Sequence, residues 1–163
     1  MPLNAVVLDQ RTLQRGSEAQ HAEWETGIRE LLSEAICNID GPATLFIELT
    51  ERQFVLRFEE EGRNLATIPL DHELLAVQIT EYLDIVRQIT NADSLNQMEA
   101  LDMAKKVTHD RAGRVLKRAL RELGFDLGTS RRLFTLLLSL KVDTTRLPGI
   151  RGHRRTRELE DES

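Results

Sequence analysis

A short run of ionisable residues with helical spacing is where chemistry could occur in this sequence. Asp102, Lys106 and His109 follow one another within about two helical turns. At about 100° per residue, Asp102 and His109 fall beside the apolar face of that helix, where burying an unpaired polar group is costly. One hypothesis is a small site in which His109 titrates and Asp102 orients its ring. The alternative is a structural network that pairs Asp102 across one turn with Lys105, Lys106 or His109.

The same helix carries a stripe of cations opposite its apolar residues. The members of this basic stripe are Lys106, Arg111, Arg114, Lys117, Arg118 and Arg121. Positive charge of one sign along a helix can bind an anionic partner, such as nucleic acid, a nucleotide or an acidic protein surface. The stripe can instead be a solvated exterior whose last cations complement the helix dipole, or it can meet acidic residues of the same chain.

Known catalytic and metal-binding patterns are missing from the sequence. The four histidines are dispersed, with no His-x-x-x-His pair, and Cys37 is the only cysteine, so no metal-ligand spacing occurs. There is no glycine-rich phosphate loop and no Gly-x-Ser-x-Gly turn. We therefore expect no metal and no cofactor, and the sequence favours a protein that is not an enzyme.

Charge divides the chain into an acidic first part and a basic second part. The 163 residues are 40% apolar and 30% charged, a composition typical of one globular domain with a core of its own. Residues 1–100 carry 7 Lys and Arg against 18 Asp and Glu, a net charge of -11, whereas residues 101–163 carry 15 against 9, a net charge of +6. The overall net charge of -5 conceals this division.

The sequence also limits where the protein acts. No apolar run approaches the ~20 residues that span a bilayer, so no membrane insertion is expected. The first residues, MPLNAVVLDQRTLQR, lack the features of a secretory signal. A single cysteine cannot form an internal disulfide, which fits a reducing compartment. We therefore expect a cytoplasmic protein.

The first half of the chain predicts strands and one helix. A short strand is expected at residues 4–8, and a helix at 18–37 begins with a capping box formed by Ser17 and Gln20. Apolar and polar residues then alternate from Thr44 through Phe58, which is typical of an antiparallel pair of strands. Residues 65–70 can add another strand, with Pro69 placing its end at an edge.

The second half predicts three helices and a tail. They are expected at residues 72–89 with Asp71 as a cap, from Ser94 to Leu123 with Gly124 as the stop, and at 129–142 in the centre of the fold. The predicted fold class is α+β, a small antiparallel sheet of three or four strands packed against about four helices. Residues 1–142 would form one domain. Residues 143–163, which include Arg151, Arg154 and Arg155, would form a flexible charged tail.

Two segments resemble a known protein family. They are QMEALDMAKKVTHDRAG, residues 97–113, and TSRRLFTLLLSL, residues 129–140. Both resemble the C-terminal half of an uncharacterised family of similarly short proteins found mainly in alphaproteobacteria. Its members show an Ile-Asp-Met run, two basic residues and a Leu-His pair, and later Ala-Arg-Arg-Leu-Phe-Thr-Leu. VVLDQRTLQR and FVLRFEEEG also look similar. Lysines stand at 105 and 106 where the family usually has arginine, and residues from Lys141 onward do not match.

The resemblance implies a compact domain in a bacterial cytoplasm and no particular activity. It marks a candidate functional cluster that consists of Asp102, Lys106, His109, Arg131 and Arg132. The two arginines can equally have a structural role, because they can cover the edge of the core or pair with the acidic half of the chain.

The sequence as a whole favours a non-enzymatic interaction or regulatory protein. It would bind an acidic partner, expected to be another protein, through the basic C-terminal half or the tail. One alternative is a binder of nucleic acid or of an anionic nucleotide. The other is a small enzyme centred on Asp102 and His109. The sequence leaves the oligomeric state open.

Overall fold

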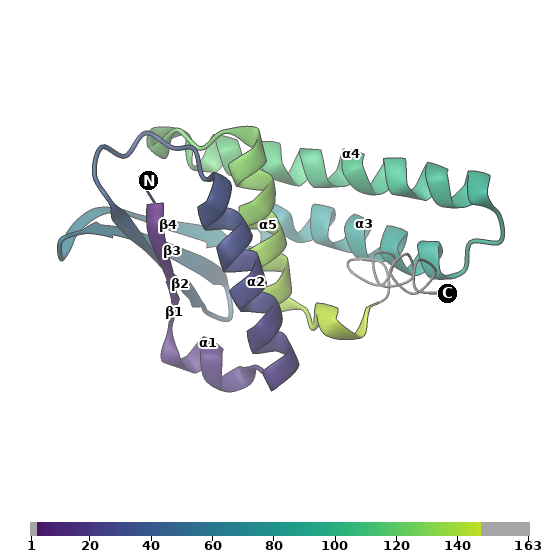
Figure 1. The fold of residues 1–163 in the computed structure, drawn as a ribbon, viewed down its shortest axis with the longest axis horizontal. Helices are drawn as coiled ribbons and strands as arrows, with labels where there is room; N and C mark the ends of the chain where they lie inside the picture. Colours follow the sequence, from purple (N-terminus) through teal and green to yellow (C-terminus); the bar gives the residue numbers. More distant parts are fainter. Residues whose placement is uncertain (1–2, 148–163) are drawn as a thin grey trace.

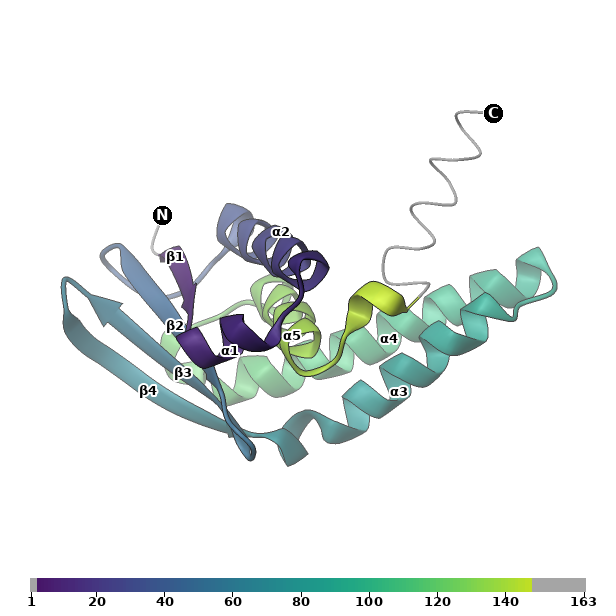
Figure 2. The same cartoon turned by 90° about the horizontal axis from the view of Figure 1, so that it is seen from below.

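The computed structural model describes residues 3–147, which form a four-stranded sheet with helices gathered on one of its faces (Figures 1 and 2). Its elements are, in chain order, β1 (Leu3–Leu8), α1 (Gln10–Arg15), α2 (Glu18–Glu34), β2 (Ala43–Leu49), β3 (Gln53–Glu60), β4 (Arg63–Asp71), α3 (His72–Thr90), α4 (Leu95–Ala119), η1 (Arg121–Leu123), α5 (Leu127–Lys141) and η2 (Thr144–Arg146). The fold class is α+β, as expected.

The sheet is mixed rather than purely antiparallel. Its order is β1-β2-β3-β4, and β2, β3 and β4 form the expected antiparallel meander. The first strand, however, pairs with β2 in parallel. The reason is the crossover through α1 and α2, which returns the chain to the end of the sheet from which β1 started. Pro69 lies in β4, at the opposite edge.

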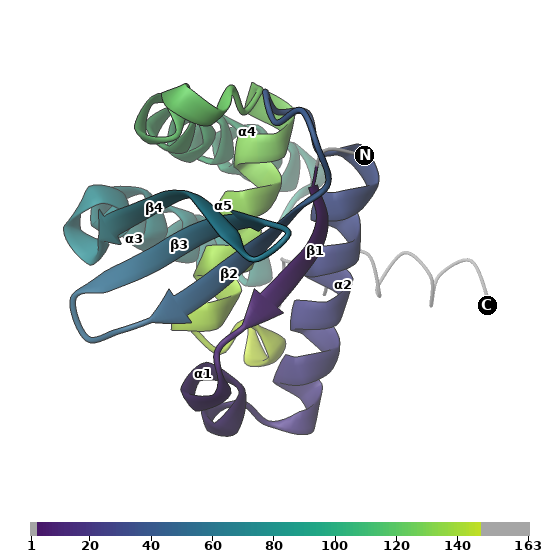
Figure 3. The same ribbon diagram turned by 90° about the vertical axis from the view of Figure 1, so that its left-hand side faces the viewer.

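Alternation along the strands separates a core face from an open face. Leu45, Ile47, Phe54, Leu56 and Phe58 are buried beneath the helices. Of their neighbours on the other face, Glu48 and Arg57 are exposed, and Phe46 and Val55 are partly exposed. Figure 3 looks onto this sheet, with the helices behind it. The period-two pattern in the sequence thus identified the buried side of β2 and β3.

The last helix, α5, is central, as its almost uniformly apolar sequence predicted. It packs between α4 and α2, and nine of its residues are buried. Trp24 of α2 fixes one side by donating a hydrogen bond from Nε1 to the carbonyl of Ser139, at 2.9 Å. α4 in turn packs against α3, so the two longest helices form an antiparallel hairpin along one side of α5 (Figure 1).

Helix α2 ends at Glu34, three residues before the expected end at residue 37. The backbone beyond it bonds to the α5 region instead of continuing the helix. Ile36 N donates to Thr129 Oγ1 at 2.9 Å, and Asn38 N donates to the carbonyl of Leu123 at 2.7 Å. Tertiary hydrogen bonds thus outweigh the helical pattern there.

The other helix ends follow the sequence in part. α4 ends at Ala119, before the expected end at Leu123, and the short helix η1 covers Arg121–Leu123. The capping box of Ser17 and Gln20 is present, Ser94 caps α4, and Gly124 adopts a left-handed conformation with φ of 64°. Asp71 forms no cap, because its carboxylate accepts a 2.8 Å hydrogen bond from Gln53 Nε2 instead. The short helix α1 was not expected.

The segment directly after α5 is part of the folded structure. Residues 143–147, assigned to the tail from sequence, contain η2, and Thr144 is buried there with its hydroxyl bonded to the carboxylate of Glu23. Leu147 packs partly against the core. The expected domain boundary at residue 142 is therefore too early. The remaining tail, with Arg151, Arg154 and Arg155, lies outside the described residues.

Within residues 3–147, none of the helices has the length and apolarity needed to cross a membrane.

Two helical glycines provide a test of how closely α5 is packed. A Cβ on Gly113 of α4 would lie 2.7 Å from Arg131 Cγ and 3.1 Å from Leu127 Cδ1, whereas one on Gly27 of α2 would make an ordinary contact of 3.4 Å with Leu136. Alanine in a helix interior is favoured over glycine by about 1 kcal/mol. We expect Gly27→Ala to raise the free energy of unfolding by up to that amount. Gly113→Ala should lower it by about 1–2 kcal/mol because of overpacking. Urea unfolding of both variants measures the difference, and equal signs would contradict this account.

Candidate functional site

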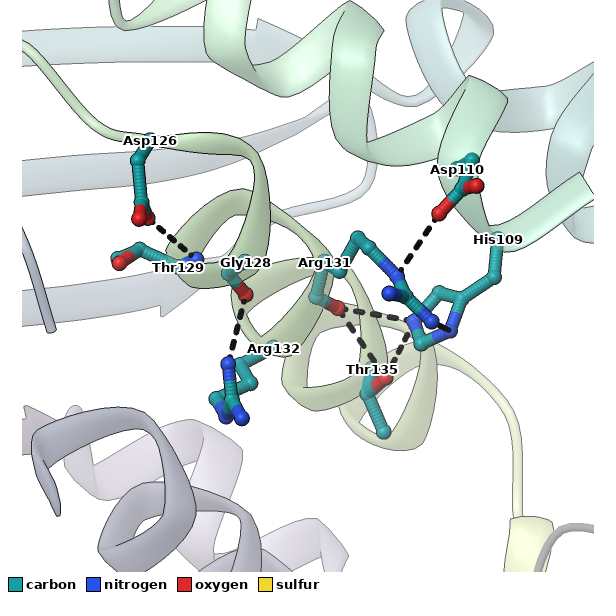
Figure 4. A network of polar contacts seen from close by, with 8 residues as sticks. All are labelled: His109, Asp110, Asp126, Gly128, Thr129, Arg131, Arg132 and Thr135. Atoms are coloured by element: carbon teal, nitrogen blue, oxygen red, sulfur yellow. Dashed lines mark hydrogen bonds and ion pairs between the residues drawn. The ribbon is translucent and has the colours of Figure 1, made fainter. Parts of the chain in front are cut away.

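His109 occupies a partly buried polar cluster where α3, α4 and α5 meet. Its Nε2 lies 3.0 Å from the carbonyl oxygen of Arg131 and 2.9 Å from Thr135 Oγ1, both on α5 (Figure 4). Its ring forms a triangle with two aromatic rings, Tyr82 on α3 at a centroid distance of 5.9 Å and Phe134 on α5 at 5.7 Å, which lie 6.1 Å from each other. The imidazole therefore connects three helices.

The neighbours of His109 determine which ring nitrogen carries the proton. Nη2 of Arg131 lies 3.5 Å from Nδ1, and a guanidinium can only donate, so Nδ1 is the accepting nitrogen. Nε2 then carries the hydrogen and donates it toward the Arg131 carbonyl and the Thr135 hydroxyl. That hydroxyl in turn donates to the same carbonyl at 3.2 Å. The contacts thus fit a neutral imidazole in one tautomer.

Burial also keeps this imidazole neutral. Desolvation lowers the pKa of His109 to about 4, the Arg131 guanidinium acts in the same direction, and the hydrogen bond to the Arg131 backbone opposes both. Desolvation raises the pKa of the Tyr82 phenol to about 12. Near neutral pH the imidazole is therefore unprotonated and the phenol protonated.

Arg131 is held between His109 and a carboxylate of α4. Its Nε is buried and lies 3.1 Å from Oδ1 of Asp110, in an ion pair whose alignment is not that of a hydrogen bond. The side chain of Arg131 on α5 passes close to Gly113 on α4, where these two helices lie close together. The guanidinium therefore bridges two residues of α4, and it also occupies the space beside Nδ1 that a substrate would need.

The other members of the predicted cluster are spread over several surfaces. Arg132 points to the opposite side of α5, where it bonds to the carboxylate of Glu34 on α2 and to the carbonyl of Gly128 at 3.1 Å (Figure 4). Lys106 is exposed. Asp102 is half-buried about two turns before His109 and interacts with Lys105. The structure thus joins His109 with Arg131 and separates them from Arg132 and Lys106.

Lys105, rather than Lys106, faces the aromatic part of the cluster. Its Nζ lies 6.0 Å from the centroid of the Tyr82 ring. Burial lowers the pKa of this lysine, and the nearby carboxylate of Asp102 acts in the opposite direction. The sequence analysis included Lys105 as a possible partner of Asp102. It did not predict that Tyr82, Asp110 and Thr135 would lie in the His109 cluster. Of these, Thr135 had a sequence signal, because it stands four residues after Arg131 on the same helix face.

The basic stripe lies on the outer face of α4 and extends into η1. All six of its side chains are exposed. Within residues 3–147, Arg111 is the one member in an ion pair, at 3.8 Å from Glu81 of α3. The acidic half of the chain therefore leaves most of this stripe uncovered. Two apolar side chains lie in the same face, Met103 at 65% exposed and Val107 at 48%.

A surface hollow of about 1110 Å³ lies away from His109, where it is formed by α1, the β2–β3 turn and the start of α3. Its lining mixes three arginines with four carboxylates. No group of three or more His, Cys, Asp or Glu side chains within residues 3–147 could hold a metal ion.

Comparisons with known proteins agree with the sequence resemblance. The model of the uncharacterised protein family UPF0262 matches residues 2–143. A UPF0262 protein of Hyphomonas neptunium is 31% identical over 157 residues, which cover 90% of this chain and 96% of the relative. One from Phenylobacterium zucineum is 32% identical, covering 85% of this chain and 91% of the relative. No solved structure is significantly similar.

The pH dependence of stability tests the neutral state of His109. Its pKa is lower in the folded chain than the value of about 6.5 expected in the unfolded chain, so below that pH the unfolded state binds the proton first. The stability contributed by neutral His109 is complete above pH ~6.5 and is lost as the pH falls toward 4. We expect the advantage of the natural chain over His109→Gln in free energy of unfolding to shrink by up to ~3 kcal/mol between pH 7 and pH 4. If urea unfolding gives the same difference in free energy of unfolding between the natural chain and His109→Gln at pH 7 and at pH 4, His109 is not held neutral.

Proposed function

The chain belongs to the uncharacterised protein family UPF0262, and we propose that it is a non-enzymatic interaction protein that binds an acidic protein surface through α4. The exposed basic stripe carries this proposal. Its cations lie on one helix face, and five of the six have no ion pair with any other described residue. A partner with carboxylates along a matching face would supply the missing opposite charges.

The apolar residues within the stripe favour a protein over nucleic acid. Met103 and Val107 stand four residues apart on the outer face of α4, directly before Arg111 and Arg114. Protein interfaces place apolar side chains at the centre and charges at the rim, and methionine and arginine are enriched there. Proteins contact a phosphate backbone through hydrogen bonds and positive charges, and two exposed apolar side chains supply neither. The alternative that the basic stripe binds DNA, RNA or an anionic nucleotide is therefore one outcome that the experiment below distinguishes.

The His109 cluster supports the non-enzymatic part of the proposal. A neutral imidazole that donates to α5 and accepts from Arg131 already uses both ring nitrogens. This arrangement favours a structural role over the enzyme hypothesis centred on Asp102 and His109. We propose a cytoplasmic location, which fits the single cysteine of the sequence, and a regulatory effect on the partner, since α4 presents an exposed binding face.

Reversing charges on the stripe tests the proposal. Arg114→Glu, Lys117→Glu and Arg118→Glu change three exposed side chains that point away from the core. We expect the triple variant to lose at least about 10-fold in affinity for the acidic protein that the natural full-length chain captures from its own cell extract, because opposite charges become like charges. Capture followed by mass spectrometry identifies the protein, and titration of the purified pair measures the loss.

The control changes net charge equally but on other surfaces. Arg52→Glu, Arg63→Glu and Arg87→Glu replace exposed cations of the β2–β3 turn, β4 and α3, and this control should retain the partner. Equal capture of the partner by the natural chain, the stripe variant and the control variant would show that the basic stripe does not bind the partner. Capture that disappears after nuclease treatment, together with DNA binding that weakens steeply between about 50 and 200 mM salt, would favour nucleic acid instead.

A further inference from the structure

The two edges of the sheet differ in how well they are protected against pairing. The edge strand β4 carries Arg63, Pro69 and Asp71, and charges and proline are the usual means by which edge strands avoid association. The opposite edge, β1, reads Leu-Asn-Ala-Val-Val-Leu and has no charged residue and no proline. Within residues 3–147, β1 pairs with β2 alone, so its second edge is unpaired (Figure 3).

An apolar groove of about 300 Å³ runs along the free edge of β1. Val6 and Val7, which point to opposite faces of the sheet, both line it, so the groove follows the edge of the strand rather than one face. Leu13 of α1 and Trp24 and Ile28 of α2 form the other wall. Val7 is 43% exposed. Unprotected backbone groups beside an apolar groove are what an added strand requires.

Charges next to the groove indicate which strand it accepts. Glu25 lines the groove, and Arg29 follows one turn later on α2. Both are exposed, and neither has an ion pair with another described residue. A surface with one free anion and one free cation, four residues apart on a helix, is complementary to itself when a two-fold axis passes between them.

We propose that β1 pairs antiparallel with β1 of a second copy of this chain. A two-fold axis through Val6 sets Ala5 of one copy opposite Val7 of the other and keeps the alternation of both strands in register. Glu25 lines the same groove as Val6. In the proposed dimer the same axis sets Glu25 and Arg29 of one copy toward the opposite charges on the α2 of the other. The strands of both copies then form one continuous sheet.

The absence of charged residues in β1 favours this pairing. Identical edges meet with no like charges opposite one another, which would destabilise the pair. The register shift between Leu3 and Ala5 limits the regular segment to the last four residues of β1, so the groove and the α2 charges must contribute as well. The basic stripe of α4 takes no part in this contact, which is therefore independent of the proposed function.

The first test compares lysine substitutions on the two edges. Val7→Lys places a charge on the free edge of β1, and Leu65→Lys places one on β4 at a side chain that is 38% exposed. Sedimentation velocity at up to about 100 μM, where a micromolar dimer is mostly formed, should give double the mass of one chain for the natural protein and for Leu65→Lys. Val7→Lys should weaken the dimer by at least about 10-fold and sediment as a single chain. A natural chain that stays monomeric, or equal dimerisation of both variants, overturns the proposal.

A charge exchange on α2 tests the two-fold geometry without altering β1. Glu25→Arg and Arg29→Glu should each weaken the dimer, because each sets like charges against each other. The double variant should restore it. Circular dichroism verifies that all of these variants fold. A double variant that dimerises no better than the single ones would overturn the antiparallel arrangement.

Discussion

The burial of α5 is the constraint on which the rest of this structure depends. A helix with nine buried residues has to find partners inside the fold for every polar group that it brings there. Neighbouring elements provide several of these partners, although within residues 3–147 the buried Oγ of Ser130 has none. Trp24 bonds to the carbonyl of Ser139, the backbone of Ile36 bonds to Thr129, and His109 bonds to the carbonyl of Arg131. These bonds fix α2, the loop after it and α4 around one central helix.

This constraint explains why residues of catalytic type are found in the interior. His109 and Arg131 meet because Gly113 lets α4 and α5 approach closely, and the space that a substrate would need is filled by their mutual contacts. Removing water from an imidazole without giving it a carboxylate partner keeps it neutral. The low pKa of His109 therefore follows from packing.

Local patterns in the sequence predicted much of the fold. Alternation gave β2 and β3, capping residues gave the starts of α2 and α4, and the uniform apolarity of α5 gave its central position. What could not be predicted depends on contacts between distant segments. The parallel pairing of β1, the early end of α2 at Glu34 and the packing of Thr144 against Glu23 are examples. The candidate site divides in the same way. Helical spacing placed His109 beside the apolar face of α4, but only the packing of α5 selects Arg131 and turns Arg132 toward Glu34.

The inner face of α4 contributes to the stability of the fold, and its outer face carries the proposed binding surface. Its inner face, with Thr108, Ala112, Gly113 and Leu116 buried, is fixed by α3 and α5. Substitution there alters the core. Its outer face contributes little to the core, so the cations along it are free to vary in number and spacing at small cost in folding free energy. A helix that is held firmly on one side and unconstrained on the other can carry a binding surface without a cleft. This arrangement reconciles an exposed basic face on α4 with a chain that is acidic overall, because the acidic residues lie mainly on other elements.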